Sequence, residues 1–104
     1  MDFISTIIID FEGTQEEISE KSYKAFLTAL EYGITISEND NDIIDERIEE
    51  LIENFPSRSA ENRAEMEKKY ESLQQQRKEN RKFIDKCENT IELIEKIADL
   101  RGWE

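Results

Sequence analysis

The side chains that could do chemistry in this 104-residue chain are carboxylates, because the sequence contains no histidine and one cysteine. Two segments, residues 16–20 (EEISE) and residues 49–53 (EELIE), carry three glutamates each in the same spacing. Carboxylates set one turn apart on a helix can bind Mg²⁺. The absence of histidine removes the commonest general base and the commonest metal ligand. Any catalysis would therefore have to start from these two acidic segments.

The Glu-Glu-x-x-Glu pattern resembles half of the metal-binding motif of the all-α nucleotide pyrophosphohydrolases. The resemblance implies helical carboxylates that hold Mg²⁺ against the phosphates of a nucleotide. The other half of the motif, Glu-x-x-Asp on a following helix, occurs nowhere downstream. Because 26 of the 104 residues are acidic, five-residue patterns of this kind are expected by chance. We expect no metal site in either segment.

A second acidic pattern, over residues 38–49, has carboxylates at four positions of a calcium-binding loop. Ile43 occupies the sixth position, where such loops need glycine for a sharp turn, and Glu38 stands where the first ligand is usually aspartate. A solvated, helix-capping segment is the preferred interpretation. No metal is predicted here either.

Nucleophilic catalysis is also not expected. Cys87 lies between Ile84 and Ile91 at helical spacing and has no histidine to activate it, so it is interpreted as a small apolar core residue. The three glycines, at positions 13, 33 and 102, cannot form a phosphate-binding loop. The prediction is a protein that is not an enzyme and uses no cofactor.

Charge divides the chain in two. Residues 1–55 contain 15 acidic and 3 basic residues, whereas residues 56–104 contain 11 of each. Residues 68–86 form a basic stretch with 7 basic and 3 acidic side chains. The overall net charge of −12 opposes direct binding of the whole molecule to nucleic acid or to an anionic membrane. The basic stretch is expected to be neutralised by the acidic residues of the chain or of a second copy.

Location follows from what the sequence lacks. One cysteine cannot form a disulfide within the chain and fits a reducing compartment. No apolar run reaches the roughly 18 residues of a membrane span. The first ten residues have no basic leader and no small-residue cleavage site, so no secretory signal is predicted. A cytoplasmic protein is expected, and the composition, rich in Ile, Lys and Glu and poor in Ala, favours a phage or mobile-element type.

The fold class predicted is predominantly all-α. Residues 3–11 fit a short helix or a small β element, and the helix is preferred because the only strand partner foreseen is residues 33–37. Residues 15–32 form a helix behind a Thr14-x-x-Glu17 capping box, with Gly33 as its stop. Residues 42–55 form a second, amphipathic helix. The joint at Phe55-Pro56-Ser57 separates an acidic helical region, residues 1–55, from residues 56–104, and both belong to one domain.

The last segment predicts one long helix, capped by Ser59 and uninterrupted until Gly102. Apolar and small residues recur every three or four positions, as in a coiled coil. About forty residues would form a rod of about 60 Å, which two shorter helices cannot cover. Self-association, most simply as a homodimer of undetermined direction, is therefore expected through Met66, Tyr70, Leu73, Arg77, Asn80, Ile84, Cys87, Ile91, Ile94 and Ala98.

The acidic exterior of the second helix is the predicted binding surface for a partner protein. Its carboxylates are Asp42, Asp45, Glu46, Glu49, Glu50 and Glu53. The function expected is a small regulator or inhibitor that binds a partner with a basic surface. Two alternatives stay open: a decoy that imitates the phosphates of DNA, and a structural coiled-coil assembly element.

Overall fold

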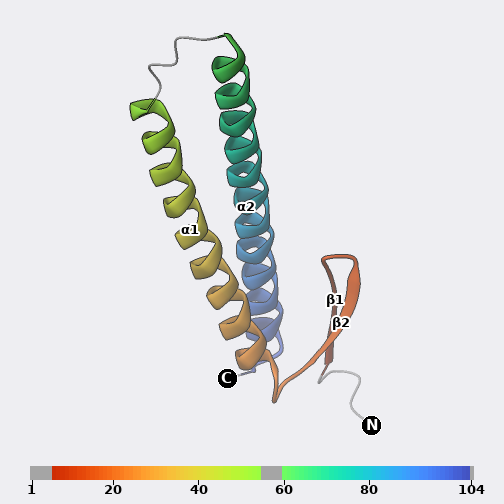
Figure 1. Cartoon of the computed structure of the whole chain (residues 1–104). Helices are drawn as coiled ribbons and strands as arrows, with labels where there is room; N and C mark the ends of the chain where they lie inside the picture. Colours follow the sequence, from red (N-terminus) through yellow and green to blue (C-terminus); the bar gives the residue numbers. More distant parts are fainter. Residues whose placement is uncertain (1–5, 55–59, 104) are drawn as a thin grey trace. The chain divides into compact units, whose positions relative to one another are not determined.

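The computed structural model describes residues 6–54 and 60–103, and only the backbone of residues 60–62. The elements follow one another as β1 (Thr6–Phe11), β2 (Thr14–Ser19), α1 (Tyr23–Glu53) and α2 (Ala60–Leu100), as Figure 1 shows. The two helices hold 77% of these residues, which confirms a mostly helical chain. The expected joint at residues 55–57, the cap at Ser59 and the start of the first segment at residues 3–5 lie outside the described residues.

The N-terminal segment is a β-hairpin, so over residues 6–11 the small β element left open by the sequence is confirmed and the preferred helix was wrong. β1 pairs with β2 antiparallel, and Phe11 lies opposite Thr14. Glu12 and Gly13 make the turn with φ angles of 53° and 78°. Two successive left-handed residues give a two-residue turn that matches the twist of the strands. The sequence signal was weak because such turns usually begin with Asn, Asp or Gly, and Glu12 is none of these.

The strand partner of β1 is therefore residues 14–19, and the expected pairing with residues 33–37 was wrong as well. Thr14 begins a strand instead of capping a helix. Ile7 and Ile9 are buried whereas Ile8 is 61% exposed, which is the alternation of a sheet with one covered face. Ile18, opposite Ile7, is buried on the same side. Three closely spaced apolar side chains on one face of the hairpin explain why it forms against the local helical spacing.

α1 begins at Tyr23, after a turn in which the amide of Ser22 donates to the carbonyl of Ser19 at 3.0 Å. It then runs through Gly33, the expected stop, and through residues 37–41 to Glu53. A glycine inside a helix costs about 1 kcal/mol relative to alanine. The buried positions continue in steps of three to seven residues across it, at Leu30, Ser37, Asn41 and Ile44. The predicted helices 15–32 and 42–55 are thus corrected to one helix of about 46 Å.

α2 confirms the long C-terminal helix, with 41 residues and a length of about 61 Å. It ends in a Schellman motif: Trp103 N donates to Ala98 O at 2.8 Å, and Gly102 N donates to Asp99 O at 3.1 Å. Gly102 supplies the left-handed residue that this cap needs, with φ of 71°. The cap turns Trp103 onto Tyr23, with ring centroids 5.3 Å apart.

The chain forms two compact units, and each combines residues from the acidic and the neutral half of the sequence. The hairpin unit, Met1–Ile34 with Asp85–Glu104, contains most of the core. Arg101 donates a hydrogen bond to the carbonyl of Thr6 and so joins the end of the chain to β1. The buried apolar side chains of the hairpin unit are Ile7, Ile9, Ile18, Tyr23, Leu30, Cys87, Ile94 and Ala98.

The helical unit, Thr35–Ile84, consists of the second part of α1 and the first part of α2. The two segments lie antiparallel, because Asn41 contacts Asn80 and Asp45 contacts Arg77. Outside residues 55–62, its buried side chains are few: Ser37, Asn41, Ile44 and Ile84. In the described part of this unit no third layer covers the two helices, so both sides of their seam carry exposed residues, and this is where the candidate surfaces lie.

Candidate functional surfaces on the helical unit

The predicted partner-binding carboxylates divide into three groups. Asp42, Glu46, Glu49 and Glu53 are exposed. They follow one another at intervals of four, three and four residues, and Glu38 extends the row four residues earlier. Side chains three or four residues apart share one side of a helix, about 5–6 Å from each other. We call Glu38, Asp42, Glu46, Glu49 and Glu53 the acidic stripe.

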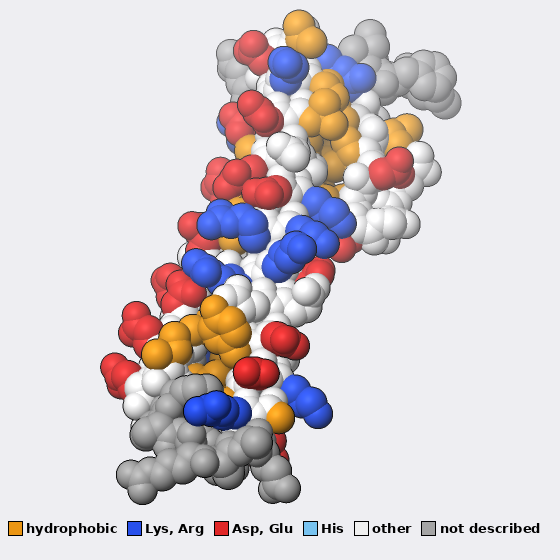
Figure 2. Space-filling view, turned by 90° about the horizontal axis from the view of Figure 1, so that it is seen from above, with side chains coloured by type: hydrophobic (Ala, Val, Ile, Leu, Met, Phe, Trp, Pro, Cys, Tyr) orange, Lys and Arg blue, Asp and Glu red, His pale blue; other side chains and the backbone are white. Residues whose placement is uncertain are grey.

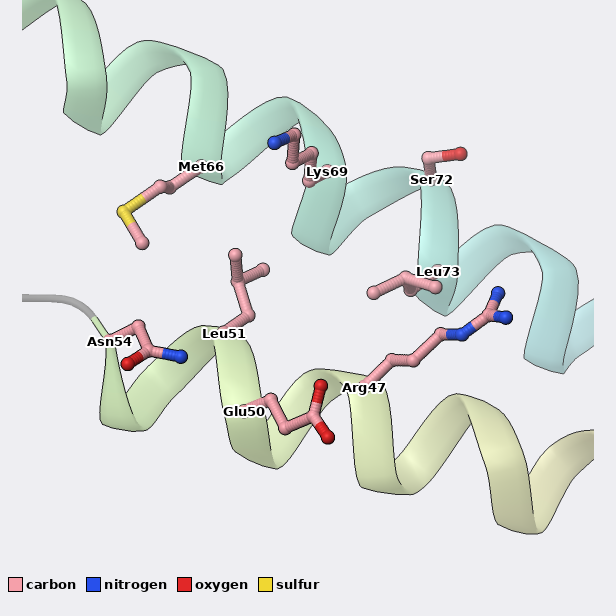
Figure 3. Close-up of a pocket in the computed structure, with 8 residues that line it drawn as sticks. All are labelled: Arg47, Glu50, Leu51, Asn54, Met66, Lys69, Ser72 and Leu73. Atoms are coloured by element: carbon pink, nitrogen blue, oxygen red, sulfur yellow. The ribbon is translucent and has the colours of Figure 1, made fainter.

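The other two predicted carboxylates point elsewhere. Asp45 Oδ1 lies 3.3 Å from Arg77 Nε, so this pair links α1 to α2. Glu50 lies beside Arg47 at a cavity between the helices (Figure 3). Within the described part of the chain, no residue of the acidic stripe has an ion-pair partner. The sequence could not separate these groups, because their roles depend on which side of α1 meets α2.

The basic stretch is partly neutralised inside the chain, as expected. Besides Arg77 with Asp45, Lys86 Nζ lies 3.5 Å from Glu12 Oε1 in the hairpin unit, and Lys82 Nζ lies 3.8 Å from Glu79 Oε1 on the same helix. Figure 2 shows basic side chains gathered near the middle of one face, with acidic side chains along an edge and apolar ones nearer the ends. All three ion pairs are largely exposed, and exposed pairs contribute little to stability.

The predicted self-association residues also separate. Ile84, Cys87 and Ile94 are 1%, 0% and 0% exposed within a single chain, and Ile91 is half-buried. Ala98 is buried too, Met66, Leu73 and Asn80 are half-buried, and Tyr70 and Arg77 are exposed. The argument that one chain cannot cover the long helix assumed two short helices in place of α1. Among the ten predicted residues, Tyr70 and Arg77 are exposed and so remain accessible to a second molecule, and self-association itself stays a prediction.

Asn80 has a partner that sequence analysis missed. Its Nδ2 donates to Asn41 Oδ1 at 3.0 Å, and Asn41 is only 9% exposed. A buried amide needs such a partner, since leaving it unpaired costs about 1–3 kcal/mol. Asn41 was grouped with the polar cluster at residues 37–41. Asn41 lies three residues before the apolar Ile44, and this helical spacing could have indicated that it faces the same buried side of α1.

Cys87 is a buried core residue of the hairpin unit. Burial raises the pKa of its thiol, and the charges of Glu12 and Glu88 raise the pKa further. The thiol is therefore protonated and poorly nucleophilic at neutral pH. This agrees with the interpretation of Cys87 as a packing residue.

The two acidic patterns considered for metal binding do not form sites. Glu16 and Glu17 lie on strand β2, where neighbouring side chains point to opposite faces. Residues 38–49 are helical, so they cannot wrap around a calcium ion. Among residues 6–54 and 60–103, no group of three or more His, Cys, Asp or Glu side chains could hold a metal ion. Over the same residues, no helix is long and apolar enough to cross a membrane.

Cavities flank the seam of the helical unit on its two sides. The cavity in Figure 3, of about 520 Å³, places Leu51 between Met66 and Leu73, with Arg47 and Lys69 at its rim. Another cavity, of about 330 Å³, is mostly apolar and is lined by Leu51, Ile52, Met66, Glu67 and Tyr70. A third, of about 560 Å³, shares Tyr70 with it and is lined further along by Asn41, Gln74, Arg77, Lys78 and Arg81.

Two of these cavities have Tyr70 as a common lining residue, and we call the surface that they make up together the tyrosine groove. It is apolar around Ile52 and Tyr70, and it is basic around Arg77, Lys78 and Arg81. Ile52 is 61% exposed and Tyr70 is 39% exposed. Sequence analysis named Tyr70 but omitted Ile52, because the seam was sought along α2 alone.

Comparison with known proteins adds no further constraint. No protein-family model matches the chain, and searches among curated proteins and solved structures found no match either. The function is therefore inferred from the acidic stripe and the tyrosine groove.

Proposed function

We propose that this chain is a non-enzymatic protein-binding module, a small self-associating regulator or inhibitor that presents the acidic stripe to a basic surface of a partner protein. The observation that carries the proposal is the arrangement of the stripe. Five exposed carboxylates share one side of α1, and none is paired within the described residues. Complementary charge across an interface speeds association and selects the partner.

The acidic stripe does not stabilise helix α1, so its composition fits a surface that binds another molecule. Like charges three or four residues apart on a helix repel each other and lower its stability. Other interactions in the molecule offset this repulsion, and binding of a basic partner would relieve it. Asp45, which pairs with Arg77, has such a cation nearby already.

A second candidate, a decoy for a nucleic-acid-binding protein, is favoured by the same row of carboxylates. Their spacing of about 5–6 Å is of the order of phosphate spacing along a DNA strand. The basic residues of α2, however, make the surface of this chain less uniformly negative than the surface expected of a DNA mimic. A purely structural assembly element is the third candidate, and for it the stripe would only maintain solubility.

Charge reversal on the stripe tests the proposal. Tagged wild-type chain and the variant Asp42→Lys/Glu46→Lys would be incubated with extract of the cells that carry the gene, and each captured protein would then be purified and titrated by calorimetry. We expect the variant to bind the purified partner at least about tenfold more weakly, because two attractive contacts become repulsive. Glu50→Lys is the matched control, since Glu50 is off the stripe.

The outcomes separate the candidates. Equal binding by wild type and by Asp42→Lys/Glu46→Lys would overturn the role of the stripe. If the purified partner binds DNA and the chain displaces that DNA, the decoy is supported. Circular dichroism of each variant would show that helix content is unchanged.

A further inference from the structure

We propose that a second copy of this chain docks on the tyrosine groove, in a parallel two-fold arrangement that sets α1 of each chain against α2 of the other. This deepens the self-association part of the proposed function and assigns it a surface. The acidic stripe could still bind a partner if this assembly did not form. Three features of the helical unit carry the inference.

The first feature is incomplete burial. The apolar end of the groove lies between two helices that no third layer covers within the described residues, and Ile52 and Tyr70 are 61% and 39% exposed there. Leu51 and Met66 below them are only half-buried. Removing these apolar side chains from water would stabilise an assembly that covers them. A second pair of helices over this cavity would complete a four-helix arrangement.

The second feature is that the two sides of the groove have opposite charge. The α2 side carries Arg77, Lys78 and Arg81, which outnumber the two acidic residues that line it nearer its apolar end, Glu67 and Glu71. The α1 side carries Asp45, and the same side of α1 carries Glu38 and Glu49, which lie seven residues before and four residues after it. A surface with an acidic and a basic half is complementary to itself when a two-fold axis exchanges the halves.

The third feature is the level of these charges along the helices. Asp45 pairs with Arg77 and Asn41 pairs with Asn80, and Ile52 and Tyr70 share a cavity. A residue of α1 and a residue of α2 therefore lie at the same height along the helix pair when their numbers sum to about 122. By this rule Lys78 and Arg81 lie at heights between those of Glu38 and Glu49. A two-fold axis parallel to the helices keeps every level unchanged.

In this arrangement each chain's basic side meets its partner's acidic side at the same height. The apolar ends then face each other as well. An antiparallel arrangement centred on Ile52 would carry Lys78 and Arg81 beyond the end of the opposite helical unit. The opposite side of the seam is less suited, because Asp40 and Glu79 line one cavity there and would repel their counterparts.

Paired charge-reversal variants test this arrangement in the full chain. Lys78→Glu/Arg81→Glu makes both sides of the groove acidic, and Glu38→Lys/Glu49→Lys makes both sides basic. We expect wild type to be a dimer by light scattering at about 100 µM, and each variant alone to be a monomer. An equimolar mixture of the two variants should form a heterodimer, because both of its interfaces again join opposite charges.

Net charge cannot imitate this result. Each reversal changes the charge by two, so from −12 the first variant has −16 and the second has −8. The mixed pair carries the same total charge as the wild-type pair. The second variant repels itself less over long range than wild type does, yet it should fail to dimerise.

Two controls keep the test decisive. Asp42→Lys/Glu46→Lys, on the outer side of the stripe, should remain a dimer, which separates the dimer contacts of Glu38 and Glu49 from the outer carboxylates that test the proposed function. If a variant loses helix content, carbodiimide cross-linking of mixed ¹⁵N-labelled and unlabelled wild-type chains replaces it. Peptides joining Lys78 to Asp45 or Glu49 of the other chain would support the arrangement.

A monomeric wild-type chain at 100 µM would overturn the proposal. A dimer whose variants fail to form the heterodimer, or whose cross-links join other residues, would overturn the groove as its interface. A partner protein that binds the groove of a monomeric chain would be a different result, and it would also reject a second copy as the occupant.

Discussion

At the scale of single residues, Asn41 and Asn80 fix how α1 and α2 align in the helical unit. Their side-chain hydrogen bond of 3.0 Å is a part-buried polar contact between the two helices. Any shift along the helices would leave the amide of Asn41 buried without a partner. Polar pairs of this kind set register at a cost in stability.

The asparagine pair gives a measurable prediction. Asn80→Ala should lower the free energy of unfolding by about 1–2 kcal/mol, because it leaves Asn41 unpaired. Urea denaturation followed by circular dichroism measures this. The exposed Asn39→Ala is the matched control and should change stability by no more than about 0.5 kcal/mol. Equal effects of the two substitutions would show that the hydrogen bond does not hold the helices in register.

At the scale of elements, the hairpin depends on its turn. Gly13 has φ of 78° and no atom within 4 Å of the position that a Cβ would occupy. A substitution there meets no steric obstacle from neighbours, so its cost is that of the left-handed backbone alone. Glu12 bears part of this cost already, with φ of 53°.

We therefore expect Gly13→Ala to lower the free energy of unfolding by about 1–2 kcal/mol. Glu12→Asn should raise it by about 0.5 kcal/mol, since asparagine tolerates the left-handed region. The ion pair with Lys86 that this change removes is exposed and weak. Thermal denaturation of both variants beside wild type would check the opposite signs, and a shift in the same direction for both would contradict the turn geometry.

At the scale of the whole molecule, burial is uneven between the two units. Among the residues whose burial is described, eight buried apolar side chains belong to the hairpin unit, whereas the helical unit has four buried residues, two of them polar. Regions with little buried apolar surface open at lower free energy than well-packed ones. The continuous helices α1 and α2 should therefore lose structure first within the helical unit.

This difference can be observed with two probes. Trp103 is the one tryptophan in the sequence and packs on Tyr23 in the hairpin unit. In a urea titration at low protein concentration, the loss of helical circular dichroism should begin before the change in Trp103 fluorescence. Amide exchange should be faster in residues 40–50 and 65–80 than in residues 87–98. Coincident transitions and uniform exchange would indicate one cooperative unit instead.

The sequence by itself determined the features that depend on composition and on long uninterrupted patterns. The mostly helical class and the existence of α2 followed from the apolar spacing and from the absence of Gly and Pro between residues 59 and 102. The separation of acidic and basic residues was also visible. Sequence-based prediction missed the turn at Glu12, and it wrongly assigned a helix cap to Thr14 and a helix end to Gly33. At these residues the local sequence preference was weaker than the tertiary packing.

Only the tertiary structure decided which side of each helix is available. Asp45 and Glu50 could not be told apart from the acidic stripe by spacing alone, because all six carboxylates lie on the polar part of one helix. By spacing alone, Ile84, Cys87 and Ile94 fit a self-association seam. In the structure these three side chains are buried within a single chain. Contacts far apart in the sequence, such as Asn41 with Asn80, carry this information, and no local pattern contains it.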